Sequence, residues 1–259
     1  MTLWVWGDEA RLEEAGRMLQ ERGFPVAQGP GGSPRAGDHL LLPPAPLKEL
    51  PPLEAEGLTL WAGLLAPDLA GRVRERGWRH VSYGEDPFFQ RENGRLTAES
   101  FLLWFMGEEK RSLREVGWAV LGLGRTGRPL LERICSWEGR GLGVTGRPQD
   151  HQDLVAKGVP ILPWEAFHPS RLGVEAVVNT APARVLPKAR LGELQGTFFF
   201  ELASSPYALE EDEAGRLGID YRRLPSLPAR VLTRSAARLL ARTVIRLWPE
   251  EGGGLWTRS

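Results

Sequence analysis

The sequence predicts an α/β fold made of two lobes, each a parallel sheet flanked by helices. Two observations lead to this: short apolar strands alternate with helices in two separate series, and one long apolar helical segment lies between the series. The chain has 259 residues, 42% of them hydrophobic and 25% charged, which is enough to bury two small cores. We expect residues 1–95 to form the first lobe and residues 112–227 the second.

The first series contains four strands and two helices. We expect the strands at 3–6, 39–42, 58–62 and 78–83, and the helices at 9–22 and 67–76. Asp8 is a suitable N-cap for the first helix, and Pro67 suits the first turn of the second helix. Two stretches rich in glycine or proline, 29–37 and 43–52, are expected to be irregular.

Two long helices are expected to join the lobes. The first spans 97–110, with Thr97 as its N-cap and Glu99 in its first turn, where a carboxylate is favoured by the helix dipole. The second spans 229–247, and the C-terminal segment 229–259 is expected to complete the first lobe. Two lobes joined in this way are expected to have a cleft between them.

The second series contains six strands, the number in one complete doubly wound nucleotide-binding domain. They are expected at 118–123, 141–145, 160–162, 176–179, 197–202 and 220–223, with helices at 126–137 and 149–157. The strand-helix alternation without long gaps implies parallel pairing throughout.

Composition excludes several classes of function. Thirty-three basic residues balance thirty-three acidic ones, which argues against nucleic acid as a partner. The N-terminal residues do not have the pattern of a secretory signal, and no apolar run is long enough to span a membrane. Cys135 is the only cysteine, so no intramolecular disulfide is possible. A cytoplasmic location is therefore expected. Prolines in loops and few thermolabile residues are typical of a thermophile. The four histidines are scattered, so no metal site is expected.

The chemistry-bearing motif is Gly-x-Gly-x-x-Gly at residues 122–127. It closes an apolar strand and opens a helix, which is the context that a Rossmann-like dinucleotide site requires. Gly122 permits the tight turn, Gly124 lets a pyrophosphate approach the backbone, and Gly127 lets the helix and strand pack closely. Leu123, Arg125 and Thr126 complete the turn, whose N–H groups are expected to hold the phosphates.

The end of the next strand favours NADP(H) over NAD(H). NAD sites usually carry an acidic residue there, which binds the ribose 2′-hydroxyl. This sequence has Thr145, Gly146 and Arg147, and no carboxylate before Asp150. A guanidinium binds a 2′-phosphate through charge-assisted hydrogen bonds, so Arg147 is the expected phosphate ligand; a solvated surface arginine is the alternative.

Two further strand ends carry polar turns at the ligand edge of the sheet. Asn179, Thr180, Ala181 and Pro182 follow the fourth strand, where a cofactor ribose is expected. The fifth strand runs into Leu202, Ala203 and Ser204, which are expected to border the nicotinamide. Ordinary turn chemistry also accounts for these residue types.

Several of these segments, in this order, resemble the A subunit of dipicolinate synthase. They are ENGRLTAESFLLWF at 92–105, VLGLGRTG at 120–127, VNTAPARVL at 178–186, ELASSP at 201–206 and LPSLPARVLTRSAARLL at 224–240. The resemblance covers nearly the whole chain. It implies an oxidoreductase that uses a pyridine nucleotide on a small, carboxylate-bearing substrate, and it implies a flavoprotein-like B subunit for a partner.

The chain also departs from the family pattern. Tyr207 and Ala208 replace two glycines after the fifth strand, which alters the backbone of a substrate loop. The resemblance gives Glu99 as a candidate substrate contact. Ser204 could donate a hydrogen bond to a substrate, and Arg234 could bind a substrate carboxylate through a bidentate pair. Each of the three also has an ordinary structural explanation.

Three hypotheses follow from the sequence. The first is an NADP(H)-dependent oxidoreductase similar to the dipicolinate synthase family, acting on a small molecule, with assembly into a homo-oligomer left open. The second is a nucleotide-binding sensor or regulatory protein that has lost catalysis, which the replaced glycines favour. The third is a reductase similar to shikimate dehydrogenase, although the Ser-x-Ser-Pro substrate motif of that group is missing.

Overall fold

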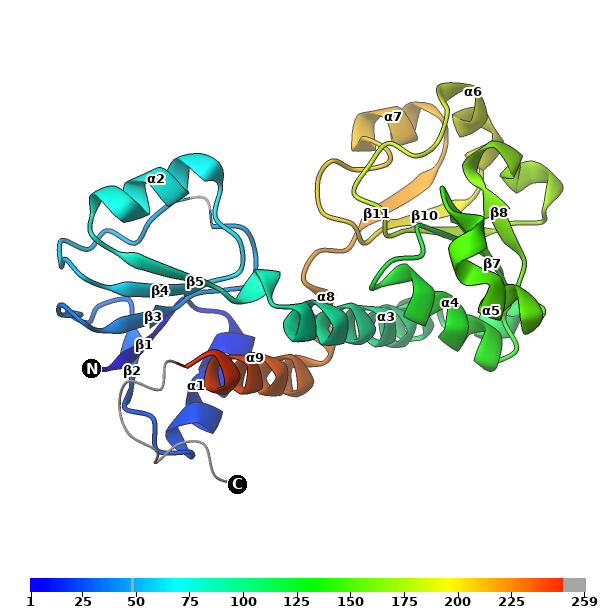
Figure 1. The fold of residues 1–259 in the computed structure, drawn as a ribbon. Helices are drawn as coiled ribbons and strands as arrows, with labels where there is room; N and C mark the ends of the chain where they lie inside the picture. Colours follow the sequence, from blue (N-terminus) through cyan, green and yellow to red (C-terminus); the bar gives the residue numbers. More distant parts are fainter. Residues whose placement is uncertain (48, 249–259) are drawn as a thin grey trace. The chain divides into compact units, whose positions relative to one another are not determined.

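The computed structural model describes residues 1–47 and 49–248, which divide into two compact units (Figure 1). The first unit consists of Met1–Leu96 together with the chain from Pro228 onwards, and the second is Thr97–Leu227. Each unit has its own parallel sheet, of five and six strands respectively. The predicted α/β class with two parallel sheets flanked by helices is confirmed.

The first unit's sheet has the strand order β2-β1-β3-β4-β5, and every pair is parallel. Its strands are β1 (Leu3–Trp6), β2 (Val26–Gly29), β3 (His39–Leu41), β4 (Thr59–Ala62) and β5 (Arg79–Ser82). The sequence did not predict β2, because it is short and merges with the glycine- and proline-rich loop that follows. Pairing with β1 along its whole length, from Leu3 opposite Val26, is what makes this segment a strand.

Helices cover both faces of this sheet: α1 (Ala10–Gln20) and α9 (Thr233–Leu247) one face, α2 (Pro67–Glu75) the other (Figure 1). The prediction that Asp8 caps α1 is wrong, because the cap position is Glu9 and no side chain caps the helix. The predicted helix at 229–247 is interrupted at Leu232 between α8 (Leu227–Val231) and α9. The last part of the predicted segment, 249–259, lies outside the described residues.

The long helix α3 (Pro87–Glu109) starts ten residues earlier than the sequence predicted, so the assignment of Thr97 as its N-cap is wrong. Asp86 caps it instead: its Oδ1 accepts a hydrogen bond from the Phe89 N–H at 2.8 Å, and Pro87 takes the first helical position. Glu99 therefore lies in the middle of the helix and gains nothing from the helix dipole.

The six predicted strands of the second unit are confirmed. They are β6 (Gly117–Leu121), β7 (Arg140–Thr145), β8 (Ile161–Pro163), β9 (Ala176–Asn179), β10 (Phe198–Glu201) and β11 (Asp220–Arg223). Their order in the sheet is β11-β10-β9-β6-β7-β8, with parallel pairing throughout. Since the chain runs outwards from β6 through β7 to β8 and then returns to β9, the sheet is doubly wound about β6 and β9.

Helices also cover both faces of the second sheet (Figure 1). α4 (Gly127–Ser136) and the second half of α3 lie on one face, where the rings of Phe101 and Phe105 have centroids 6.1 and 4.6 Å from that of Trp118. α6 (Lys188–Leu191) and α7 (Glu211–Arg216) lie on the other. The predicted helix at 149–157 is the 3-10 turn η3 (Pro148–His151) followed by α5 (Gln152–Ala156).

Candidate dinucleotide site

The carboxyl ends of β6 and β9 mark the place where the direction of winding reverses in the second unit. Ligands of open parallel sheets bind outside the strand ends at such a reversal. The glycine turn (residues 122–127) follows β6, and the 179–182 turn follows β9. The structure therefore brings together two of the predicted segments at the edge where a ligand is expected.

Each glycine of the glycine turn meets a different spatial demand. Gly122 has φ +83°, which disfavours any other residue, and an added Cβ would lie 2.9 Å from the Ala181 Cβ. A Cβ on Gly124 would meet nothing within 4 Å. A Cβ on Gly127 would lie 1.8 Å from the Gly122 carbonyl oxygen, which shows how closely helix and turn are packed. The turn is thus tightly packed everywhere except in front of Gly124.

The glycine turn also presents unused hydrogen-bond donors. Within the described chain, the backbone N–H groups of Gly124, Arg125 and Thr126 donate to no protein acceptor, and α4 begins directly afterwards at Gly127. Free N–H groups at the positive end of a helix favour an anion. Leu123 is buried and anchors the turn, whereas Gly124 and Arg125 are exposed. The shape of the glycine turn and its free N–H groups therefore suit a bound pyrophosphate.

The 179–182 turn is hydrogen-bonded to the glycine turn and to the strand before it. Thr180 Oγ1 lies 2.8 Å from the Gly122 carbonyl oxygen and 3.1 Å from that of Leu121. The buried Asn179 side chain accepts from the Ala181 N–H at 3.1 Å and donates to the Ala181 carbonyl at 3.0 Å, which fixes the turn after β9. Pro182 follows on the surface.

A buried carboxyl group, that of Glu201, lies beneath these turns, and the sequence reasoning did not single it out. Glu201 is 1% exposed at the end of β10. Its Oε1 accepts from Asn179 Nδ2 at 2.8 Å and from the Ala203 N–H at 3.0 Å, while Oε2 accepts from the Ala208 N–H at 3.0 Å. Burial raises the pKa of Glu201 to about 7, although the three hydrogen bonds act in the opposite direction.

Glu201 therefore ties the turn after β9 to the whole 201–208 loop after β10. The available signal in the sequence was an acidic residue directly after three phenylalanines at a strand's carboxyl end. Leu202 and Ala203 are half-buried in this loop, and the Leu202 N–H donates to the Asn179 carbonyl at 2.9 Å. Ser204 is exposed, and its hydroxyl makes no hydrogen bond in the described chain.

The end of β7 carries the residues predicted to select the cofactor. Thr145 is buried, and its Oγ1 accepts from the Arg147 N–H at 3.3 Å. The Arg147 side chain is 79% exposed, with its Nε 3.7 Å from Asp150 Oδ2. This geometry is open to an incoming phosphate, and Asp150 is the carboxylate with which a phosphate would compete.

Of the candidate catalytic residues, Glu99 is engaged in an ion pair and Arg234 is exposed. Glu99 Oε1 pairs with Arg133 Nη2 at 2.5 Å, which links α3 to α4. Arg234 belongs to the first unit, where its side chain is 80% exposed and 4.0 Å from Glu14 Oε1. Ser204 is the candidate whose polar group remains available in the second unit.

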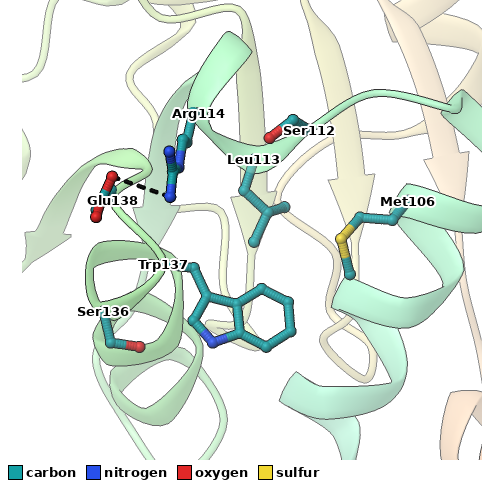
Figure 2. A pocket seen from close by; sticks show the side chains of 7 residues that line it. All are labelled: Met106, Ser112, Leu113, Arg114, Ser136, Trp137 and Glu138. Atoms are coloured by element: carbon teal, nitrogen blue, oxygen red, sulfur yellow. Dashed lines mark ion pairs between the residues drawn. The ribbon is translucent and has the colours of Figure 1, made fainter.

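A shallow pocket of the second unit lies at the opposite edge of the sheet from the glycine turn (Figure 2). Its walls come from segments that precede β6 and β7, so it opens at the amino ends of the strands. Trp137, Leu113 and Met106 line it together, and Arg114 pairs with Glu138 at 3.0 Å at the rim. The pocket does not contribute to the dinucleotide site.

The described residues contain no helix that is both long and apolar enough to cross a membrane. They also contain no cluster of three or more histidine, cysteine or acidic side chains that could hold a metal ion. His39 accepts a hydrogen bond from Trp61 Nε1 at 2.7 Å in the first unit, and His168 contacts Glu193 at 3.2 Å in the second. Both histidines are thus used in packing or in surface pairing.

Comparison with solved structures confirms the resemblance at the level of the fold. The A subunit of dipicolinate synthase from Bacillus halodurans matches with a TM-score of 0.81 and 20% identity, over 95% of this chain and 97% of that one. The corresponding dipicolinate synthase chain from Bacillus subtilis matches with a TM-score of 0.79 and 18% identity, over 95% of each chain.

The same fold extends to other dehydrogenases. An L-alanine dehydrogenase matches with a TM-score of 0.63 and 14% identity, over 94% of this chain and 88% of that one. A Salmonella D-lactate dehydrogenase matches with a TM-score of 0.59 and 11% identity, over 98% of each chain. No family model and no curated protein matches the sequence. The chain thus has the fold of nucleotide-binding dehydrogenases and is similar in structure to the A subunit of dipicolinate synthase.

Proposed function

We propose that this chain binds NADP(H) on its second unit and acts as an oxidoreductase on a small, carboxylate-bearing substrate, in the manner of the dipicolinate synthase family. The observation that carries the proposal is the glycine turn. It combines three unused backbone N–H donors, a helix N-terminus and open space in front of Gly124, at the point where the winding of the sheet reverses.

The chain's own residues supply binding and orientation. The N–H groups of Gly124, Arg125 and Thr126 hold the pyrophosphate, and Thr180 holds the shape of the turn through the Gly122 carbonyl. Glu201 fixes the two loops that border the nicotinamide end. The nicotinamide supplies the hydride chemistry when it is bound. Ser204 is the group available to donate a hydrogen bond to a substrate.

The glycine turn is tested by Gly124→Val. Because no atom lies within 4 Å of the added Cβ, the protein should remain folded, while the side chain occupies the place of the pyrophosphate. We expect calorimetric titration to show loss of both NADPH and NADH binding. The matched control is Gly215→Val on α7, where the space is equally open and binding should be unchanged. Unchanged affinity in Gly124→Val would refute the site.

Cofactor preference is tested by Arg147→Ala. A hydrogen bond to a charged group is worth about 1.5–3 kcal/mol, so the substitution should weaken NADPH about tenfold or more and leave NADH nearly unchanged. Arg140→Ala, at the amino end of the same strand and 68% exposed, is the control. The preference should weaken as salt is raised, since Arg147 is exposed to solvent. Equal wild-type affinities for the two cofactors, or equal losses of both in Arg147→Ala, would show that Arg147 is only a surface arginine.

A nucleotide-binding sensor without catalysis is the second candidate function, and two observations favour it. The buried Ala208, at a position where the resembling family has glycine, holds its N–H against Glu201 rather than toward a ligand. Glu99 is engaged with Arg133. Turnover assays with NADPH and NADP⁺ on a panel of cyclic imines and dicarboxylates, with and without a flavoprotein-like partner, separate the two functions. Cofactor binding without turnover of any substrate would favour the sensor.

A further inference from the structure

The strands β7 and β8 end side by side, and this brings an indole ring to the predicted adenosine end of the site. Thr145 pairs with Pro163, so the next residues, Gly146 and Trp164, follow at the same level of the sheet. A Cβ built on Gly146 would lie 3.0 Å from Trp164 Nε1 and 3.6 Å from its Cδ1. The N–H edge of the indole therefore faces the end of β7, and only a glycine at 146 leaves it undisturbed.

The Trp164 N–H has no protein acceptor in the described chain. Other indole N–H groups are used internally: Trp61 donates to His39 and Trp78 to the Ala55 carbonyl, each at 2.7 Å. Trp164 itself is half-buried, and its ring packs against the hydrophobic core between the sheet and its outer helices. A ring held in this way presents its N–H donor in a fixed direction.

The charged groups near this donor are one guanidinium and two carboxylates. The backbone from Thr145 to Arg147 carries no carboxylate, and the exposed guanidinium of Arg147 follows directly. Two carboxylates stand near in sequence: Asp150, which is paired with Arg147, and the exposed Glu165 next to Trp164. An indole nitrogen can only donate, so it suits a phosphate oxygen and cannot accept from a ribose hydroxyl as a carboxylate does.

We propose that Trp164 is a specificity-determining residue whose indole N–H donates to the 2′-phosphate of NADP(H), beside Arg147. The proposal rests on the proposed function and deepens it, since it names a second phosphate ligand on a different strand end. Gly146 has a defined part in this arrangement: it leaves room for the indole N–H edge to reach the phosphate position.

The test is Trp164→Phe, which keeps an aromatic ring in the core and removes the donor. The probes are 2′,5′-ADP and 5′-ADP, which report on the adenosine end alone, together with NADPH and NADH. We expect 2′,5′-ADP and NADPH to bind about tenfold more weakly, and 5′-ADP and NADH to change less than about twofold. Trp137→Phe, on an exposed ring at the opposite edge of the same sheet, should change none of these affinities.

A second variant tests whether the effect of Trp164→Phe comes from repacking of the core instead of loss of the N–H donor. Gly146→Ala leaves Trp164 intact but places a methyl group 3.0 Å from its Nε1, so it should reproduce the selective loss of 2′,5′-ADP. Unchanged 5′-ADP affinity shows that each variant is folded. Equal losses of both nucleotides, or no loss of 2′,5′-ADP in Trp164→Phe, overturns the inference while leaving dinucleotide binding intact. Failure of the wild type to bind either dinucleotide instead overturns the proposed function.

Discussion

The substitution Glu201→Gln tests the buried carboxyl group that joins the two loops of the site. Glutamine keeps one acceptor oxygen for Asn179 and the Ala203 N–H, but its NH₂ group has no lone pair for the Ala208 N–H. Leaving a buried donor unpaired costs about 1–3 kcal/mol. At pH 5, where the native carboxyl is protonated, we expect the variant to be destabilised by about that amount.

The destabilisation caused by Glu201→Gln should become smaller as the pH rises. The folded protein raises the pKa of Glu201 from 4.5 to about 7, so the folded state binds the proton more tightly than the unfolded chain does. This contribution to stability is fully present below pH 4.5 and is lost as the pH rises through about 7. The shift corresponds to about 3 kcal/mol, and glutamine cannot titrate. Between pH 5 and pH 8 the destabilisation by Glu201→Gln should therefore shrink by up to about that amount.

The assay is urea unfolding of the wild type and the variant at pH 5, 6, 7 and 8, followed by circular dichroism. The difference between the two proteins isolates Glu201, because other titrating groups such as His39 contribute equally to both. A difference that stays constant within about 0.5 kcal/mol across this range would refute the reasoning. It would show that Glu201 is ionised in the native protein throughout, with its three hydrogen bonds outweighing its burial.

Three further outcomes are expected. Gly127→Ala should lower the free energy of unfolding by about 1–3 kcal/mol, because its Cβ would collide with the Gly122 carbonyl, and urea unfolding against Gly124→Ala checks this. Burial lowers the pKa of His39 to about 4. Its contribution to stability is therefore present above pH 6.5 and is lost as the pH falls through about 4. An NMR titration of His39 with a midpoint near 6.5 would contradict this. Glu99→Gln should cost less than about 1 kcal/mol and leave NADPH affinity unchanged, since the carboxylate is 40% exposed and serves a helix-helix pair; calorimetry and urea unfolding measure both.

The elements that the sequence predicted well are those with a strong local signal. The strand-turn-helix around Gly122, Gly124 and Gly127 was predictable because each glycine answers a local steric demand, and the structure shows the positive φ, the open space and the close packing. The six strands of the second unit were predictable because each is a short apolar run between turn residues.

The features that the sequence missed depend on contacts between distant segments. The role of Glu201 follows from hydrogen bonds that the local sequence does not reveal. Its carboxyl group accepts from the Asn179 side chain, 22 residues away along the chain, and from the Ala208 N–H at the far end of a loop. Strand β2 exists because β1 pairs with it. The early start of α3 had a local signal in Asp86 and Pro87, but the polar run after them hid the helical pattern. Trp164 faces Gly146 only because β7 and β8 are neighbours in the sheet.

The packing of α9 against α1 determines the order in which the two units can fold during synthesis. The apolar side of α1, including Leu12 and Leu19, belongs to one core cluster with Leu240 and Val244 of α9, more than 200 residues later. During synthesis the second unit is continuous in sequence and is complete once Leu227 has left the ribosome. The first unit, although it emerges earlier, keeps an uncovered apolar face until α9 follows. Its completion is therefore the last step, and a chain cut short before Thr233 would expose this surface to chaperones and proteases.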